Sequence, residues 1–142
     1  MVGPGRRFKT ADVAQQMVGG FLLAGPFVVT AEVWQLATNM NNVQLLLSVA
    51  IVVGIGYGAL YKAEERDPDR ERDVAGVPLR FLSLMAVSFG SVLLLALVFD
   101  APATFFADFG VAPEDELLVT AKAVSVGAIF SVVGAATADS VF

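Results

Sequence analysis

Two ionisable side chains stand inside strongly apolar segments of this chain, Glu32 and Lys122. Glu32 lies in the run Gly-Pro-Phe-Val-Val-Thr-Ala-Glu-Val-Trp-Gln, where it is the single charged residue. A carboxylate at membrane depth is costly, and a bare ion buried there would carry a Born penalty of about 20 kcal/mol. Glu32 must therefore be paired, protonated or wetted, which makes it the first candidate for a functional residue.

The depths of these two residues match. Glu32 lies six residues before Thr38, where its apolar segment ends, and Lys122 lies six residues after Glu116, where the last apolar segment begins. At about 1.5 Å per helical residue, each would lie about 9 Å below the same membrane boundary. We therefore predict an intramembrane pair that acts as a gate or as an ion- or proton-binding site. The alternatives are a structural ion pair that fixes helix register, and a Lys122 side chain that snorkels outward alone.

A stripe of small and polar residues on the first apolar segment would supply a pathway beside Glu32. Helical spacing places a glycine and two amide side chains on the face of Glu32. Pro26 removes a backbone hydrogen bond and should kink the helix, and freed carbonyls can line a cavity. The alternatives are a helix contact face, a proline that only shapes the helix, and a Thr30 hydroxyl that bonds back to its own helix. The candidate pathway and kink residues are Gly25, Pro26, Thr30, Gln35 and Asn39.

The composition that must position these residues is that of a membrane protein. Of 142 residues, 56% are hydrophobic and 16% are charged, whereas a soluble domain carries about 25% charged residues. Long apolar stretches separated by short polar ones indicate transmembrane helices, each of about 20 residues. We predict an all-α polytopic membrane protein, a single four-helix transmembrane bundle. Its spans cover about residues 13–38, 43–61, 79–99 and 116–141.

The connections between the spans differ in charge. A charged loop covers residues 62–78, and a Phe-rich segment predicts a short interfacial helix between spans three and four. The rings of Phe105, Phe106 and Phe109 would sit in lipid. Apart from Lys122, every basic residue precedes span one or lies between spans two and three or at their ends. The positive-inside rule then places both termini and the charged loop on the cytoplasmic side of the cell membrane.

Small residues recur at four-residue spacing in all four predicted spans. They allow close backbone approach, either inside the bundle or between subunits. Because four helices of this length can hardly enclose a wide pore, we also predict a homo-oligomer. The candidate helix-packing residues are Gly54, Gly58, Gly127, Ser131 and Gly134.

Asp139 falls near the cytoplasmic end of the last span. It could pair with Arg80 at the start of span three, or contact Gln15 and Gln16. A solvated charge at the helix end is the interpretation that we favour from the sequence.

Several classes of function find no support in the residue types. The chain has no cysteine and no histidine, which removes thiol, imidazole and zinc-type chemistry. We find no phosphate loop, dinucleotide motif or nucleophile–base set, so we expect no enzyme, no metal site and no cofactor. A net charge of −5 argues against nucleic-acid binding. An acidic, lysine-poor composition is typical of a halophilic source.

The first span carries one local resemblance. The arrangement Gly25-Pro-Phe…Thr30-Ala-Glu-Val-Trp34, with the overall span layout, resembles a prokaryotic, including haloarchaeal, family of integral membrane proteins of unknown function. The resemblance implies a membrane protein and supplies no activity or site residue.

Two functions are compatible with these patterns. The first is an oligomeric channel or transporter subunit for an ion or small solute, in which Glu32 binds or gates and Lys122 counters it. The alternative is a non-transporting scaffold or accessory subunit in the lipid bilayer, which docks a cytoplasmic partner through the 62–78 loop.

Overall fold

A computed structural model describes residues 8–63 and 73–141, and almost all of them are helical. Two antiparallel strands of two residues each form a hairpin just before the helix that begins at Leu79, with Asp73 opposite Pro78. The elements are α1 (Thr10–Val28), α2 (Ala31–Asn39), α3 (Asn42–Tyr57), the π-helical turn η1 (Gly58–Ala63), β1 (Asp73–Val74), β2 (Val77–Pro78), α4 (Leu79–Val98), α5 (Ala101–Phe109), the 3₁₀ turn η3 (Pro113–Asp115) and α6 (Glu116–Val141).

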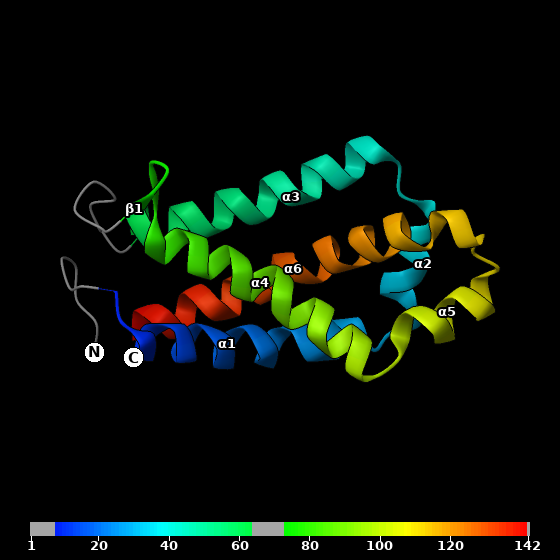
Figure 1. The fold of residues 1–142 in the computed structure, drawn as a ribbon, viewed down its shortest axis with the longest axis horizontal. Helices are drawn as coiled ribbons and strands as arrows, with labels where there is room; N and C mark the ends of the chain where they lie inside the picture. The colour runs from blue at the N-terminus through cyan, green and yellow to red at the C-terminus, as the bar shows by residue number, and fades with distance from the viewer. Residues whose placement is uncertain (1–7, 64–72, 142) are drawn as a thin grey trace.

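Four long helices, α1, α3, α4 and α6, run along the long axis of the molecule (Figure 1). The start of α1 and the end of α6 lie at one end of this bundle, which we call the terminal end. The short helices α2 and α5 lie at the opposite end, which we call the capped end. Helix α6 is central, since it packs against α1, α3, α4 and α2, and its most extensive contact is with α1.

The all-α membrane fold predicted from composition is confirmed. Three segments are long and apolar enough to cross a membrane: Asn42–Tyr61, Leu79–Val98 and Pro113–Asp139. The fourth is a bent pair, because α1 and α2 meet at an angle of 79° across a two-residue break. The first span is therefore not the continuous helix expected over residues 13–38. The kink expected at Pro26 appears three residues later as a full corner, at Val29 and Thr30.

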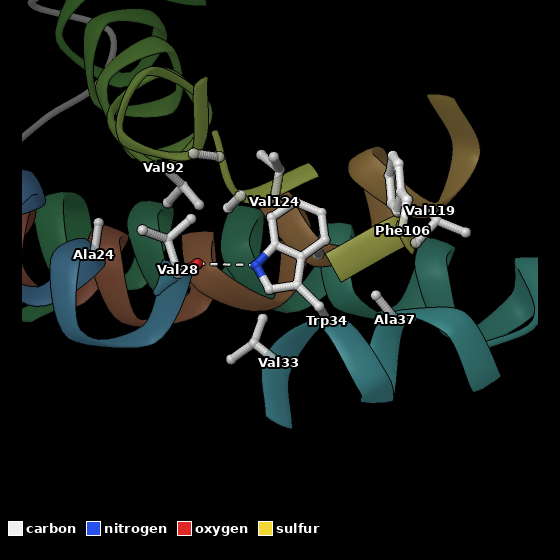
Figure 2. Close-up of a cluster of buried hydrophobic side chains, with 12 residues drawn as sticks. Ala24, Val28, Val33, Trp34, Ala37, Val92, Phe106, Val119 and Val124 are labelled. Carbon is white, nitrogen blue, oxygen red and sulfur yellow. Dashed lines mark hydrogen bonds between the residues drawn. The ribbon is translucent and has the colours of Figure 1, made fainter. Parts of the chain in front are cut away.

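Hydrogen bonds to the last carbonyls of α1 hold this corner. The Thr30 hydroxyl donates to the carbonyl of Phe27 at 3.1 Å, which is the back-bonding alternative for Thr30. The Trp34 indole Nε1 donates to the carbonyl of Val28 at 2.8 Å (Figure 2). Trp34 is fully buried. Because a carbonyl left without a partner at a buried helix end is costly, this indole stabilises the break.

Aromatic side chains join the two short helices of the capped end. The ring centroids of Trp34 and Phe106 lie 5.8 Å apart in a T-shaped contact, and Phe105 stacks on Trp34 at the same distance. The predicted short helix between spans three and four is present as α5, but the expectation that its rings sit in lipid is wrong for Phe106, which is buried. The physical reason is the corner at Thr30, which carries Trp34 beneath α5.

Small residues set the distance between α1 and α6. A Cβ atom built on Gly134 would overlap the carbonyl of Gly19, and the Ser131 hydroxyl donates to the carbonyl of Gly20 at 3.1 Å. A Cβ on Gly127 would lie 2.7 Å from a methyl of Val92 on α4. Gly127, Ser131 and Gly134 thus lie at contacts between helices of the described chain.

The two glycines predicted to pack on α3 behave differently. A Cβ built on Gly54 or Gly58 would meet no atom within 4 Å. Among the described residues, neither glycine lies against another helix. The GxxxG spacing alone did not reveal which side of α3 faces α6.

Candidate functional site

Glu32 lies in the first turn of α2, and its side chain is exposed. It forms no hydrogen bond or ion pair with the residues that the structure describes. The depth estimate for Glu32 assumed a straight helix from Val13 to Thr38. Because α2 turns 79° away from α1, residues counted along α2 do not measure depth along the bundle.

Lys122 is buried, with 7% of its surface exposed. Its Nζ donates to the carbonyl oxygen of Met40 at 2.6 Å, in the connection between α2 and α3. Within the described part of the chain, Lys122 forms no ion pair with a carboxylate. The structure therefore does not bring Glu32 and Lys122 together, and Lys122 instead ties α6 to the end of α2.

This geometry predicts that a charge swap between Glu32 and Lys122 will not restore stability. Glu32→Gln should leave the unfolding midpoint in detergent unchanged, because the side chain is exposed and unpaired. Lys122→Glu should lower stability by about 1–3 kcal/mol, because the Met40 carbonyl loses its donor. Adding Glu32→Lys to Lys122→Glu should not restore the lost stability. Recovery of stability in the double variant would show that the two side chains interact directly after all.

A pocket of about 510 Å³ opens at the capped end, between the end of α2, the α5–α6 connection and the start of α6. It contains two of the residues singled out in the sequence, Asn39 and Lys122, together with an acid that the sequence reasoning missed, Asp115. The pocket is lined by Thr38, Asn39, Phe109, Gly110, Val111, Ala112, Asp115, Leu118, Val119 and Lys122.

The remaining pathway residues do not reach this pocket. Gly25 and Pro26 stay on α1 before the corner, and Pro26 is exposed. The backbone carbonyl of Gln35 accepts hydrogen bonds from the side chains of Thr38 and Asn39, within α2 itself. The stripe predicted along one straight helix is divided by the bend into two parts that point in different directions.

The charges around the pocket are uneven. The segment from residue 99 to residue 121 carries five acids and no basic residue. Asp115 lies at the end of η3 and Lys122 seven residues later on α6, and both line the pocket without forming an ion pair with each other. Two side chains of opposite charge thus line the pocket.

A second polar cluster lies at the terminal end, around the fully buried guanidinium of Arg80. Arg80 Nη1 contacts both carboxylate oxygens of Asp139, at 2.8 and 2.9 Å. Its Nη2 lies 3.4 Å from Asp12 Oδ2, and its Cζ lies 5.0 Å from the ring centre of Phe8. The solvated helix end that we favoured for Asp139 is wrong, because burial between α1, α4 and α6 forces the carboxylate to pair.

Gln16 extends this cluster toward the middle of the bundle. Its Oε1 accepts a hydrogen bond from Ser83 at 2.6 Å, while its Nε2 is buried without a partner among the described residues. Sequence reasoning did not select Asp12 or Gln16 as a pair. Their spacing of four residues, continued by Gly19 and Gly20, is the helical signal that marks the α1 face toward α6 and α4.

The described residues contain no group of three or more acids placed to hold a metal ion. A family model described as "Putative integral membrane protein (DUF2391)" matches residues 6–137. Searches of curated proteins and of solved structures gave no match.

Proposed function

The chain belongs to the DUF2391 family of integral membrane proteins, and from this premise we propose that it is a subunit of a membrane transporter for a small solute. The solute would enter the pocket at the capped end. The transporter class is the one predicted from the sequence. The proposed site is the pocket around Lys122 instead of a Glu32–Lys122 pair.

The observation that carries this proposal is the buried ammonium of Lys122 in the wall of an open pocket. Its volume of about 510 Å³ lies in the range of about 300–1,000 Å³ that small-molecule sites occupy. A charged side chain buried in a membrane protein is expensive and is usually functional. With one carbonyl partner in the described chain, the ammonium has further donors to offer a solute.

The break between α1 and α2 adds a second line of support. Discontinuous helices at membrane depth are tolerated where they are buried in protein or line a cavity, and transporters use them beside the binding site. Here α2 leads directly into the pocket through Thr38 and Asn39. In the described arrangement the Gly19–Gly134 contact holds α1 and α6 together below the pocket. Passage would therefore need these two helices to separate or slide.

We also propose the orientation and setting of the protein. The start of α1 and the end of α6 lie at one end of the bundle (Figure 1), which supports the prediction that the two termini share one side of the membrane. Together with the positive-inside rule, this favours the cytoplasm for the terminal end and the exterior for the pocket. A homo-oligomer in the cell membrane, a single transmembrane domain, a halophilic source and the absence of enzymatic activity remain predictions.

Osmotic swelling of proteoliposomes would test the transport function. We would compare glycerol, lactate, choline and L-leucine as neutral, anionic, cationic and zwitterionic solutes. Protein-dependent flux of at least one of them should fall about tenfold in Lys122→Met and stay unchanged in Glu32→Gln, which is the matched control. A tenfold effect corresponds to about 1.4 kcal/mol. Absence of flux for all four solutes would contradict the proposal.

The alternative function is a scaffold that does not transport. One observation favours it, the close α1–α6 contact at Gly19 and Gly134, which leaves no open path between these helices. The docking loop predicted at residues 62–78 lies largely outside the described residues, which omit 64–72. A protein that assembles normally but moves none of the four solutes would favour this alternative.

A further inference from the structure

We infer that the pocket at the capped end binds a zwitterion, a small molecule that carries one anionic and one cationic group. The anionic group would contact Lys122 and the cationic group Asp115. The inference rests on the proposed function for its site and goes further by naming the chemical class of the ligand.

The first step is the state of Lys122. An ammonium has three N–H donors, and the described structure gives one of them an acceptor, the carbonyl of Met40. The side chain is 7% exposed and lines the pocket, so a ligand in the pocket could meet its remaining donors. A carboxylate or phosphate oxygen would supply the missing acceptors and compensate the buried charge.

The second step is the position of Asp115. It lies at the end of η3, seven residues before Lys122, and both residues line the same pocket. Among the described residues, the Lys122 ammonium contacts the Met40 carbonyl and forms no ion pair with Asp115. The exposed carboxylate of Asp115 remains available to a cation.

The third step is that neither a simple anion nor a simple cation suits this pocket. A free anion would approach an end of the molecule where residues 99–121 carry five acids and no basic residue. A free cation would meet the ammonium of Lys122 at the pocket wall. A zwitterion satisfies both charges at once. Phe109, Val111 and Leu118 contribute apolar atoms to a lining that is otherwise mainly polar.

Binding measured in nanodiscs would test this inference without requiring transport. We would use nanodiscs of phosphatidylglycerol, whose headgroup is anionic, and titrate three probes: L-leucine, L-leucinamide, which lacks the carboxylate, and N-acetyl-L-leucine, which lacks the ammonium. L-leucine should bind at least tenfold more tightly than either probe with a single charge. Equal binding of the three probes, tighter binding of a singly charged one, or no binding of L-leucine would overturn the inference.

Two substitutions assign the contacts. Lys122→Met should remove the preference for L-leucine over L-leucinamide, and Asp115→Asn should remove the preference over N-acetyl-L-leucine. Asp108→Asn is the matched control, because Asp108 is an exposed acid of α5 that does not line the pocket. Since Asp115 is exposed, its variant should fold even if Lys122→Met does not. Preferences that survive Asp115→Asn, or that fall equally in the Asp108 variant, would contradict the assignment.

The source of the zwitterion is decided by the lipid. If affinity for L-leucine is unchanged in nanodiscs of phosphatidylethanolamine, the ligand is a free solute. If L-leucine is displaced there, the lipid headgroup occupies the pocket. In that second case the inference holds while the proposed transport of a solute fails. If the protein transports a solute but does not discriminate the charged probes, the proposed transport holds and the zwitterion inference fails. Failure of the inference and failure of the proposed function are therefore distinguishable.

Discussion

Replacing Asp139 by Asn is expected to destabilise the folded protein by about 3–5 kcal/mol, because it breaks a buried ion pair and leaves the other charge without full compensation. Both Asp139 and Arg80 are fully buried, and both carboxylate oxygens lie within 2.9 Å of Arg80 Nη1. The loss should appear in unfolding by SDS titration, followed by circular dichroism. It should also lower the amount of folded protein recovered from membranes.

Asp12→Asn is the graded control for this experiment. Asp12 approaches Arg80 at 3.4 Å, and its carboxylate also accepts the backbone N–H of Lys9 at 2.8 Å. An Asn in its place keeps an oxygen for that N–H, so the loss should be clearly smaller than for Asp139→Asn. Equal losses in the two variants would contradict the assignment of Asp139 as the main partner.

A double variant separates the charge pair from packing. Arg80→Met together with Asp139→Leu removes both charges and keeps apolar volume near the ends of α4 and α6. Proteins in which a buried ion pair is replaced by apolar residues of similar volume are often no less stable than the original protein. We therefore expect the double variant to be more stable than the sum of the two single losses predicts. Strict additivity would mean that the two side chains do not interact.

Replacing Gly134 by Ala is the second large effect that we expect. A Cβ at this position would overlap the carbonyl of Gly19, and backbone atoms cannot move aside as a flexible side chain can. Overpacking costs about 1–3 kcal/mol and occasionally more, and a clash with backbone should reach the upper end of this range. The measurement is the same SDS titration. The α1–α6 spacing can be followed in parallel by spin labels at exposed sites on the two helices.

Gly54→Ala is the matched control, because the same added methyl group would meet no atom within 4 Å on α3. In an α-helix, Ala is more favourable than Gly by about 0.5–1 kcal/mol, so this variant should be neutral or slightly stabilising. The two glycine variants should thus shift stability in opposite directions. A neutral Gly134→Ala would show that the α1–α6 contact is looser than described.

The sequence alone determined the class of the protein and most of its helices. Predicted spans at 43–61, 79–99 and 116–141 agree closely with α3 and its π-helical turn, α4 and α6, because a run of about 20 apolar residues can satisfy its backbone in a bilayer only as a helix. The short helix before the last span was also predictable, from the spacing of Phe105 and Phe109 and from Pro102 near its start. These features depend on the local pattern of residues and on the bilayer in which that pattern must fold. The apolar composition of the sequence indicates the bilayer, so both can be inferred from the sequence.

Only the tertiary structure decided which charges meet. A helix period of 3.6 residues places residues on a face but does not say which helix that face contacts, and Asp139 is an example: its pairing with Arg80 depends on α4 and α6 lying side by side. The depth match between Glu32 and Lys122 failed because a corner of 79° interrupts the first span. That corner is stabilised by the bond from Trp34 to the Val28 carbonyl and by the contact of Trp34 with Phe106 on a distant helix. Counting along one helix cannot detect a bend that is held by contacts with another.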